Sequence, residues 1–136
     1  MLLPAFTPRR RLLVPAITTG DSNIGVGYGA VKAATTGSQN VGVGVNTLAT
    51  LTTASYNTAL GTSALTANTS GANNVAVGTN ALEANTTASY NTAVGKSALA
   101  ANTTGTECTA VGQGALDASN GSYNTGVGSD TWVLML

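Results

Sequence analysis

The sequence predicts an all-β fold, a parallel β-solenoid built of seven coils of about 17 residues each. Three observations predict it: a unit that recurs at fixed spacing, a glycine at the same place in every unit, and few large side chains. The spacing is 17 residues five times and then 16, with units that start at Asn23, Asn40, Asn57, Asn74, Asn91, Cys108 and Asn124. Such self-similarity is typical of coils that stack on their neighbours.

The residues within each unit favour strands and turns over helices. Glycine, asparagine and threonine fall in every unit, and they are poor residues for a helix interior. The stretch TAVG that begins at Thr92 alternates small and apolar residues, as a short half-buried strand does. The piece that follows, ending in Ala-Leu, predicts a second short strand, and the stretch ANTTG predicts the turn that closes the coil.

The fifth position of every unit is glycine. Because glycine accepts a positive φ and the close approach of another backbone, we expect these residues to turn the chain at a corner of the coil. The predicted turn glycines are Gly27, Gly44, Gly61, Gly78, Gly95, Gly112 and Gly128.

Two apolar columns are expected to run along the inside of the solenoid. The fourth positions form a valine column, and the ninth positions form a leucine column that starts at Val31 and ends at a tryptophan. We predict the structural core from Val26, Val43, Leu60, Val77, Val94, Val111 and Val127 in the first column, and from Leu48, Leu65, Leu82, Leu99, Leu116 and Trp132 in the second.

Three tyrosines recur on alternate units, at Tyr56, Tyr90 and Tyr123, and we interpret them as residues that pack in a column in preference to residues that bind a ligand. Cys108 takes the place of the first asparagine of its unit, and we expect a small buried residue there instead of a reactive thiol.

Few residues could carry chemistry. The chain has no histidine, and its five acidic residues are scattered along the sequence. We therefore expect no enzyme, and no catalytic residue, cofactor or metal site. A net charge of zero makes nucleic acid an unlikely partner, and no apolar run is long enough for insertion into a membrane.

The two ends differ from the repeats. Residues 1–22 contain all three prolines and three consecutive arginines, which predicts an extended arm that docks on a larger protein. The docking residues would be Phe6, Arg9, Arg10, Arg11, Leu12 and Leu13. A floppy, solubilising tail is the alternative interpretation of the arm. The repeat solenoid spans residues 23–128, and residues 129–136 form an apolar tip.

Alanine, threonine and glycine supply 62 of the 136 residues, so a single chain is short of the large apolar side chains that drive folding. A core shared between several chains would relieve that shortage. We therefore expect the chain to be its own partner.

The repeats resemble those of two kinds of fibrous protein. NTALGTSAL at Asn57, NVAVGTNAL at Asn74 and NTAVGKSAL at Asn91 are similar to the head repeats of trimeric autotransporter adhesins and to NTAVGxxAL arrays of phage tail-fibre proteins. The resemblance covers residues 23–128. It implies a left-handed parallel β-roll and a homotrimer of side-by-side or intertwined chains, as in a triple β-helix. For function it is less specific, because one fold supports many functions.

Three function classes follow. The first is a bacteriophage structural protein located in the virion, a short trimeric tail fibre or a capsid decoration that binds a capsid, portal or tail protein. It is favoured because the sequence shows no coiled-coil stalk or membrane-anchor barrel of the adhesins.

The second is an adhesin module on a bacterial cell surface. A host surface receptor would be a partner of either class. The third is an ice-binding solenoid, since paired threonines such as Thr52–Thr53 and Thr86–Thr87 recur in register.

Overall fold

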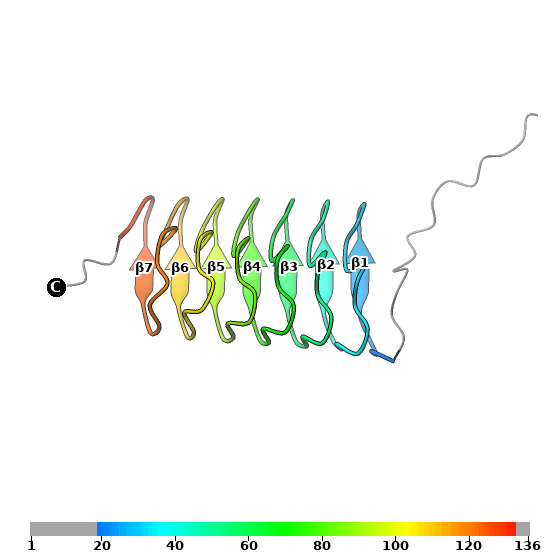
Figure 1. The fold of residues 1–136 in the computed structure, drawn as a ribbon. Coiled ribbons are helices and arrows are strands. Elements are labelled where there is room, and N and C mark those ends of the chain that lie inside the picture. The colour runs from blue at the N-terminus through cyan, green and yellow to red at the C-terminus, as the bar shows by residue number, and fades with distance from the viewer. Residues whose placement is uncertain (1–18, 133–136) are drawn as a thin grey trace, which may run out of the picture.

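A computed structural model describes residues 19–132. Within that range the chain contains no helix, and its seven strands form one parallel sheet in sequence order (Figure 1). The strands are β1 Ile24–Val26, β2 Val41–Val43, β3 Thr58–Leu60, β4 Val75–Val77, β5 Thr92–Val94, β6 Thr109–Val111 and β7 Thr125–Val127. The predicted all-β, parallel solenoid is confirmed.

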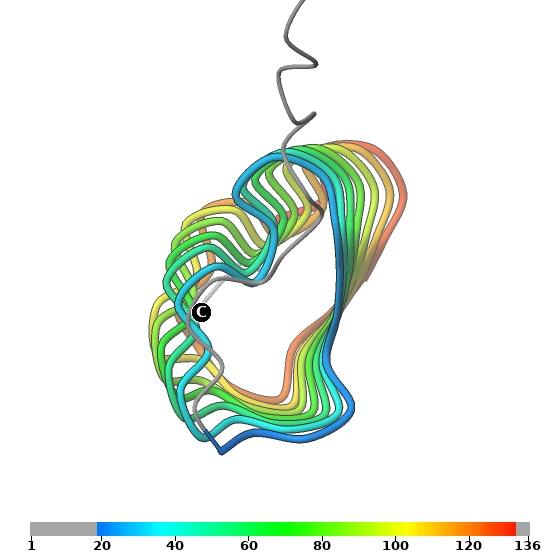
Figure 2. The same cartoon turned by 90° about the vertical axis from the view of Figure 1, so that its right-hand side faces the viewer.

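Each coil lies directly on the next. Strand pairing is offset by one repeat unit, so that Ala76 faces Ala93 and Val77 faces Val94 across neighbouring strands. Figure 2 shows the stack from its N-terminal end, with the strands superposed along one side of the coils. The chain ascends along the strands and winds counterclockwise as it recedes from the viewer, which makes the solenoid left-handed.

The predicted second strand of each coil is absent from residues 19–132. The stretch after each glycine is a run of turns, and Leu65, Leu82 and Leu99 there have φ values of 51°, 51° and 50°. This left-handed conformation is incompatible with a strand and costs roughly 1–2 kcal/mol per residue. Complete burial of these leucine side chains offsets that cost.

The leucine column forms the centre of the core, as predicted. Its members Val31, Leu48, Leu65, Leu82, Leu99 and Leu116 are at most 1% exposed. Trp132 was expected to end the column, but its side chain is 67% exposed. The main chain keeps the register, since Leu116 N–H donates to Thr131 O (2.8 Å) as Leu99 N–H donates to Ala115 O (3.0 Å). No coil among the described residues covers Trp132.

The valine column does not lie inside the solenoid, so that prediction is wrong for the single chain. The side chains of Val26, Leu60, Val111 and Val127 are exposed, and those of Val43, Val77 and Val94 are half-buried. In four of the seven strands the residue before it, Ala59, Ala76, Ala93 or Ala110, is fully buried instead. Because strand side chains alternate between the two faces, an inward alanine forces the following valine outward.

A column of asparagines completes the interior. Asn40, Asn57, Asn74 and Asn91 are fully buried, and each backbone N–H donates to the side-chain oxygen of the residue one coil earlier. Their side-chain amides donate to main-chain carbonyls, as Asn57 Nδ2 does to Gly71 O (2.9 Å). Buried polar groups are costly unless they are hydrogen-bonded, and this asparagine column meets that requirement coil by coil.

The turn glycines behave as predicted. All seven have positive φ, between 125° and 137°, a region that only glycine occupies without strain. The coils also approach closely here, since a Cβ built on Gly61 would lie 2.6 Å from the carbonyl carbon of Gly78.

The stacked structure begins before the predicted boundary at residue 22. Thr19 N–H and Gly20 N–H both donate to Thr35 O, and Asp21 O accepts from Gln39 N–H (2.9 Å). Residues 19–22 therefore belong to the first coil. The proposed docking residues of the arm lie outside the described residues, and so does the end of the apolar tip, residues 133–136.

Candidate functional site

Ionisable side chains do not converge in the part of the chain that the structure describes. No group of three or more histidine, cysteine, aspartate or glutamate residues there could hold a metal ion. Cys108 is buried, as predicted, and its thiol donates to Gly121 O (3.1 Å) in place of an asparagine amide. Candidate sites must therefore be sought among the surfaces of the solenoid.

One such surface is the outer face of the parallel sheet. Each strand presents its first and third residues outward, and these residues form two columns along the axis. We call the following residues the outer sheet face: Ile24, Val26, Val41, Val43, Thr58, Leu60, Val75, Val77, Thr92, Val94, Thr109, Val111, Thr125 and Val127.

The outer sheet face is apolar and open. Ten of its fourteen residues are valine, leucine or isoleucine, and Leu60 is 48% exposed in the middle of the sheet. Seven strands at about 4.8 Å spacing and three residues at about 3.3 Å give a strip of about 30 by 10 Å. An apolar patch of this size is often functional, so the outer sheet face is a candidate interaction surface. We did not predict from the sequence that the first residue of each strand faces outward. It directly follows a buried asparagine, so the alternation of strand side chains would have predicted it.

The tyrosines do not form a buried, packed column, so that interpretation is wrong. Tyr56, Tyr90 and Tyr123 are 58%, 61% and 74% exposed. They lie in one exposed line with a polar residue on each coil between them. We call this line the tyrosine row; it consists of Gln39, Tyr56, Asn73, Tyr90, Glu107 and Tyr123. The row runs beside the outer sheet face, because each member precedes the first outward strand residue by two positions.

The threonine pairs form two columns of different character. The first threonine of each pair is half-buried, and three of these hydroxyls donate to the chain itself: Thr35 Oγ1 to Thr52 O and Thr52 Oγ1 to Thr69 O, both at 3.1 Å, and Thr103 Oγ1 to Asn120 Oδ1 at 2.9 Å. The second threonine, such as Thr53 or Thr87, is exposed. Most hydroxyls of the first column are therefore already occupied by the chain, which weakens the argument for ice binding.

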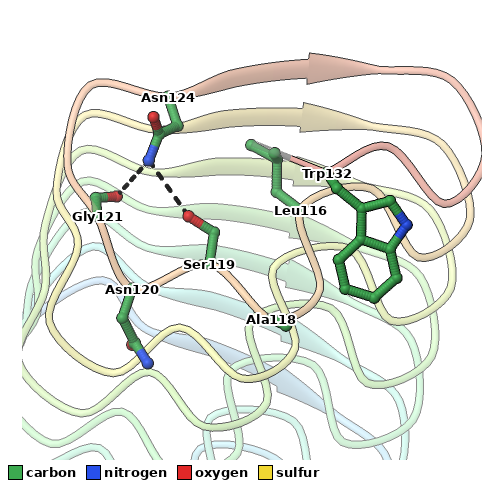
Figure 3. Close-up of a pocket in the computed structure, with 7 residues that line it drawn as sticks. All are labelled: Leu116, Ala118, Ser119, Asn120, Gly121, Asn124 and Trp132. Atoms are coloured by element: carbon green, nitrogen blue, oxygen red, sulfur yellow. Dashed lines mark hydrogen bonds between the residues drawn. The ribbon is translucent and has the colours of Figure 1, made fainter. Parts of the chain in front are cut away.

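A small hollow of about 120 Å³ lies at the C-terminal end of the stack (Figure 3). It is lined by Leu116, Ala118, Ser119, Asn120, Gly121, Asn124 and Trp132. Asn124 Nδ2 donates to Gly121 O (2.9 Å) and Ser119 Oγ (3.2 Å), as the dashed lines in Figure 3 show. The hollow lies where a further coil would stack, and it contains no ionisable group.

The chain matches no family model, no curated protein and no solved structure. Within residues 19–132 no helix is long and apolar enough to cross a membrane.

Proposed function

We propose that the protein is a non-enzymatic structural component of a bacteriophage virion, a short trimeric fibre or a capsid decoration. Residues 1–18 anchor it to a capsid, portal or tail protein, and the solenoid projects from that anchor or braces the assembly. The assignment to a virion rests on the likeness of the repeats to tail-fibre arrays. A module of a bacterial surface adhesin is the alternative that the same repeats suggest.

The exposure of apolar side chains on the outer sheet face supports self-association. The core of the single chain consists mainly of alanine, leucine and asparagine, whereas most of its valines face water. Burying one such valine completely is worth roughly 1.5–3 kcal/mol relative to leaving it exposed. Three copies that bring this face together would therefore gain apolar burial that the single chain lacks.

Light scattering of the full chain tests the association, and about three times 13.3 kDa is expected. Val94→Asp places a charge on the outer sheet face without entering the core, so we expect a folded monomer. Thr87→Asp, on an exposed turn, is the matched control and should leave the trimer intact. A parent chain that is folded and monomeric would refute the trimer.

Removal of residues 1–18 tests the anchor. Because the first coil begins at Thr19, the truncated chain should fold and associate like the parent. It should fail to join the parent particle in a reconstitution assay. Normal incorporation of the truncated chain would contradict docking through the arm.

A further inference from the structure

The tyrosine row is costly for the fold and is not explained by packing. Tyr56, Tyr90 and Tyr123 have φ values of 62°, 63° and 63°, in the left-handed region that disfavours bulky residues. Asn73 occupies the same place with φ 57°, and asparagine tolerates that conformation well. Unlike the leucines, these tyrosines are mostly exposed, so burial does not offset the strain.

The backbone holds the row in strict register. The N–H groups of Tyr56, Asn73 and Tyr90 donate to Ser38 O, Ser55 O and Ala72 O of the preceding coil at 3.1–3.2 Å. Since φ is nearly the same at every member, the side chains leave the backbone in equivalent directions. The tyrosines therefore repeat every second coil, about 9.6 Å apart at the usual strand spacing.

The chemistry of the row alternates with the same period. Exposed phenol rings provide rigid amphipathic surfaces, and Tyr is favoured at binding sites because it loses little conformational entropy. Between the rings lie Asn73 and Glu107, with Gln39 before the first ring, and all three can form hydrogen bonds with a ligand. Within residues 19–132 the phenol oxygens of the three row tyrosines have no hydrogen-bond partner.

We propose that the tyrosine row binds an extended β-1,4-linked glycan that lies along the solenoid axis. In such a polymer successive sugars are flipped, so the same apolar sugar face returns at every second residue. The rise of one sugar is close to the spacing between coils. Each ring would stack on alternate sugars, and the amide and carboxylate groups would bind the hydroxyls of the sugars between.

Nucleic acid also stacks on aromatic rings, but the charge of the solenoid favours a neutral glycan as the ligand. Residues 19–132 contain two lysines against five carboxylates, and the row itself carries Glu107 and no cation. A polyphosphate backbone would find no counter-charge there.

Native electrophoresis in gels that contain hydroxyethylcellulose tests the proposal, with dextran, an α-1,6-linked glucan, as the control polymer. We expect retardation by the β-1,4-glucan alone. Calorimetry with cellohexaose and chitohexaose then shows which sugar is preferred. Both hexasaccharides should bind at least tenfold more tightly than their disaccharides, because only the longer chains reach all three rings.

The triple variant Tyr56→Asn, Tyr90→Asn, Tyr123→Asn keeps the fold, since asparagine already stands at residue 73. It should lose retardation completely, whereas Thr36→Asn, Thr53→Asn, Thr87→Asn on the exposed threonine column should be retarded like the parent. Light scattering of the triple tyrosine variant should give the mass of the parent. Unchanged retardation of that variant, an unretarded parent, or loss of self-association in the variant would each overturn the proposal.

Discussion

Asn74→Ala measures what the asparagine column contributes to stability. Asn74 Oδ1 accepts from Asn91 N–H (3.0 Å), and its Nδ2 donates to Asn57 Oδ1 (3.1 Å) and Ala88 O (2.9 Å). The substitution removes all three hydrogen bonds from a site that is fully buried.

The three losses are unequal. Asn57 Oδ1 still accepts from Asn74 N–H, and Ala88 O still accepts from Asn85 Nδ2, so each of these acceptors loses only one of two donors. A single hydrogen bond contributes about 0.5–1.5 kcal/mol net, whereas an orphaned buried donor costs about 1–3 kcal/mol. Asn91 N–H becomes such an orphan. We therefore expect the free energy of unfolding to fall by about 2–6 kcal/mol.

Urea denaturation followed by circular dichroism measures this loss as a lower midpoint. Asn73→Gln is the matched control: the neighbouring asparagine is exposed, and Gln39 occupies the equivalent place with nearly the same φ. A surface change of this kind should stay within about 0.5 kcal/mol of the parent. If Asn74→Ala unfolds at the same urea concentration as the parent, the reasoning about the column is wrong.

Three further substitutions can be measured by the same denaturation assay. Leu82→Ala empties a fully buried site and should cost about 2–5 kcal/mol; a smaller loss would contradict tight packing of the column. Gly78→Ala combines a φ of 134° with a Cβ 2.6 Å from the carbonyl carbon of Gly95, so at least about 3 kcal/mol should be lost. Cys108→Asn restores an acceptor for Asn124 N–H and should raise stability by about 1 kcal/mol; a decrease would contradict that assignment.

The sequence was sufficient for the period, the class of fold and the turn glycines. Repetition fixes the stacking, because residues 17 apart must lie in the same environment. Glycine at one position in every unit left a sharp turn as the simplest explanation, and the positive φ values agree.

The phase of each strand could not be predicted in the same way. Valine is more hydrophobic than alanine, so Val77 was assigned to the interior in preference to Ala76. The narrow coil instead places alanine beside the leucine column, and a shift of one residue exchanges the two faces of a strand. Asn74 supplies the missing signal, since a buried amide ladder two residues before Ala76 sets the phase.

The tyrosine row was misjudged for a related reason. A recurring aromatic residue usually packs in a core, and the sequence does not reveal the left-handed backbone that turns Tyr90 outward. The spacing in the sequence shows the two-coil period of the row, whereas only the structure shows that its tyrosines are exposed to a ligand.

The orientation of the strands governs how the solenoid responds to tension. The strands lie across the long axis, so hydrogen bonds such as that from Val75 N–H to Asn91 O run along it (Figure 1). A force that pulls the two ends apart loads the terminal coil first and peels the coils away one by one. Each step releases 17 residues, about 58 Å of extended chain. A component loaded in this way would lengthen in stages, dissipating energy at each stage before the next coil is strained.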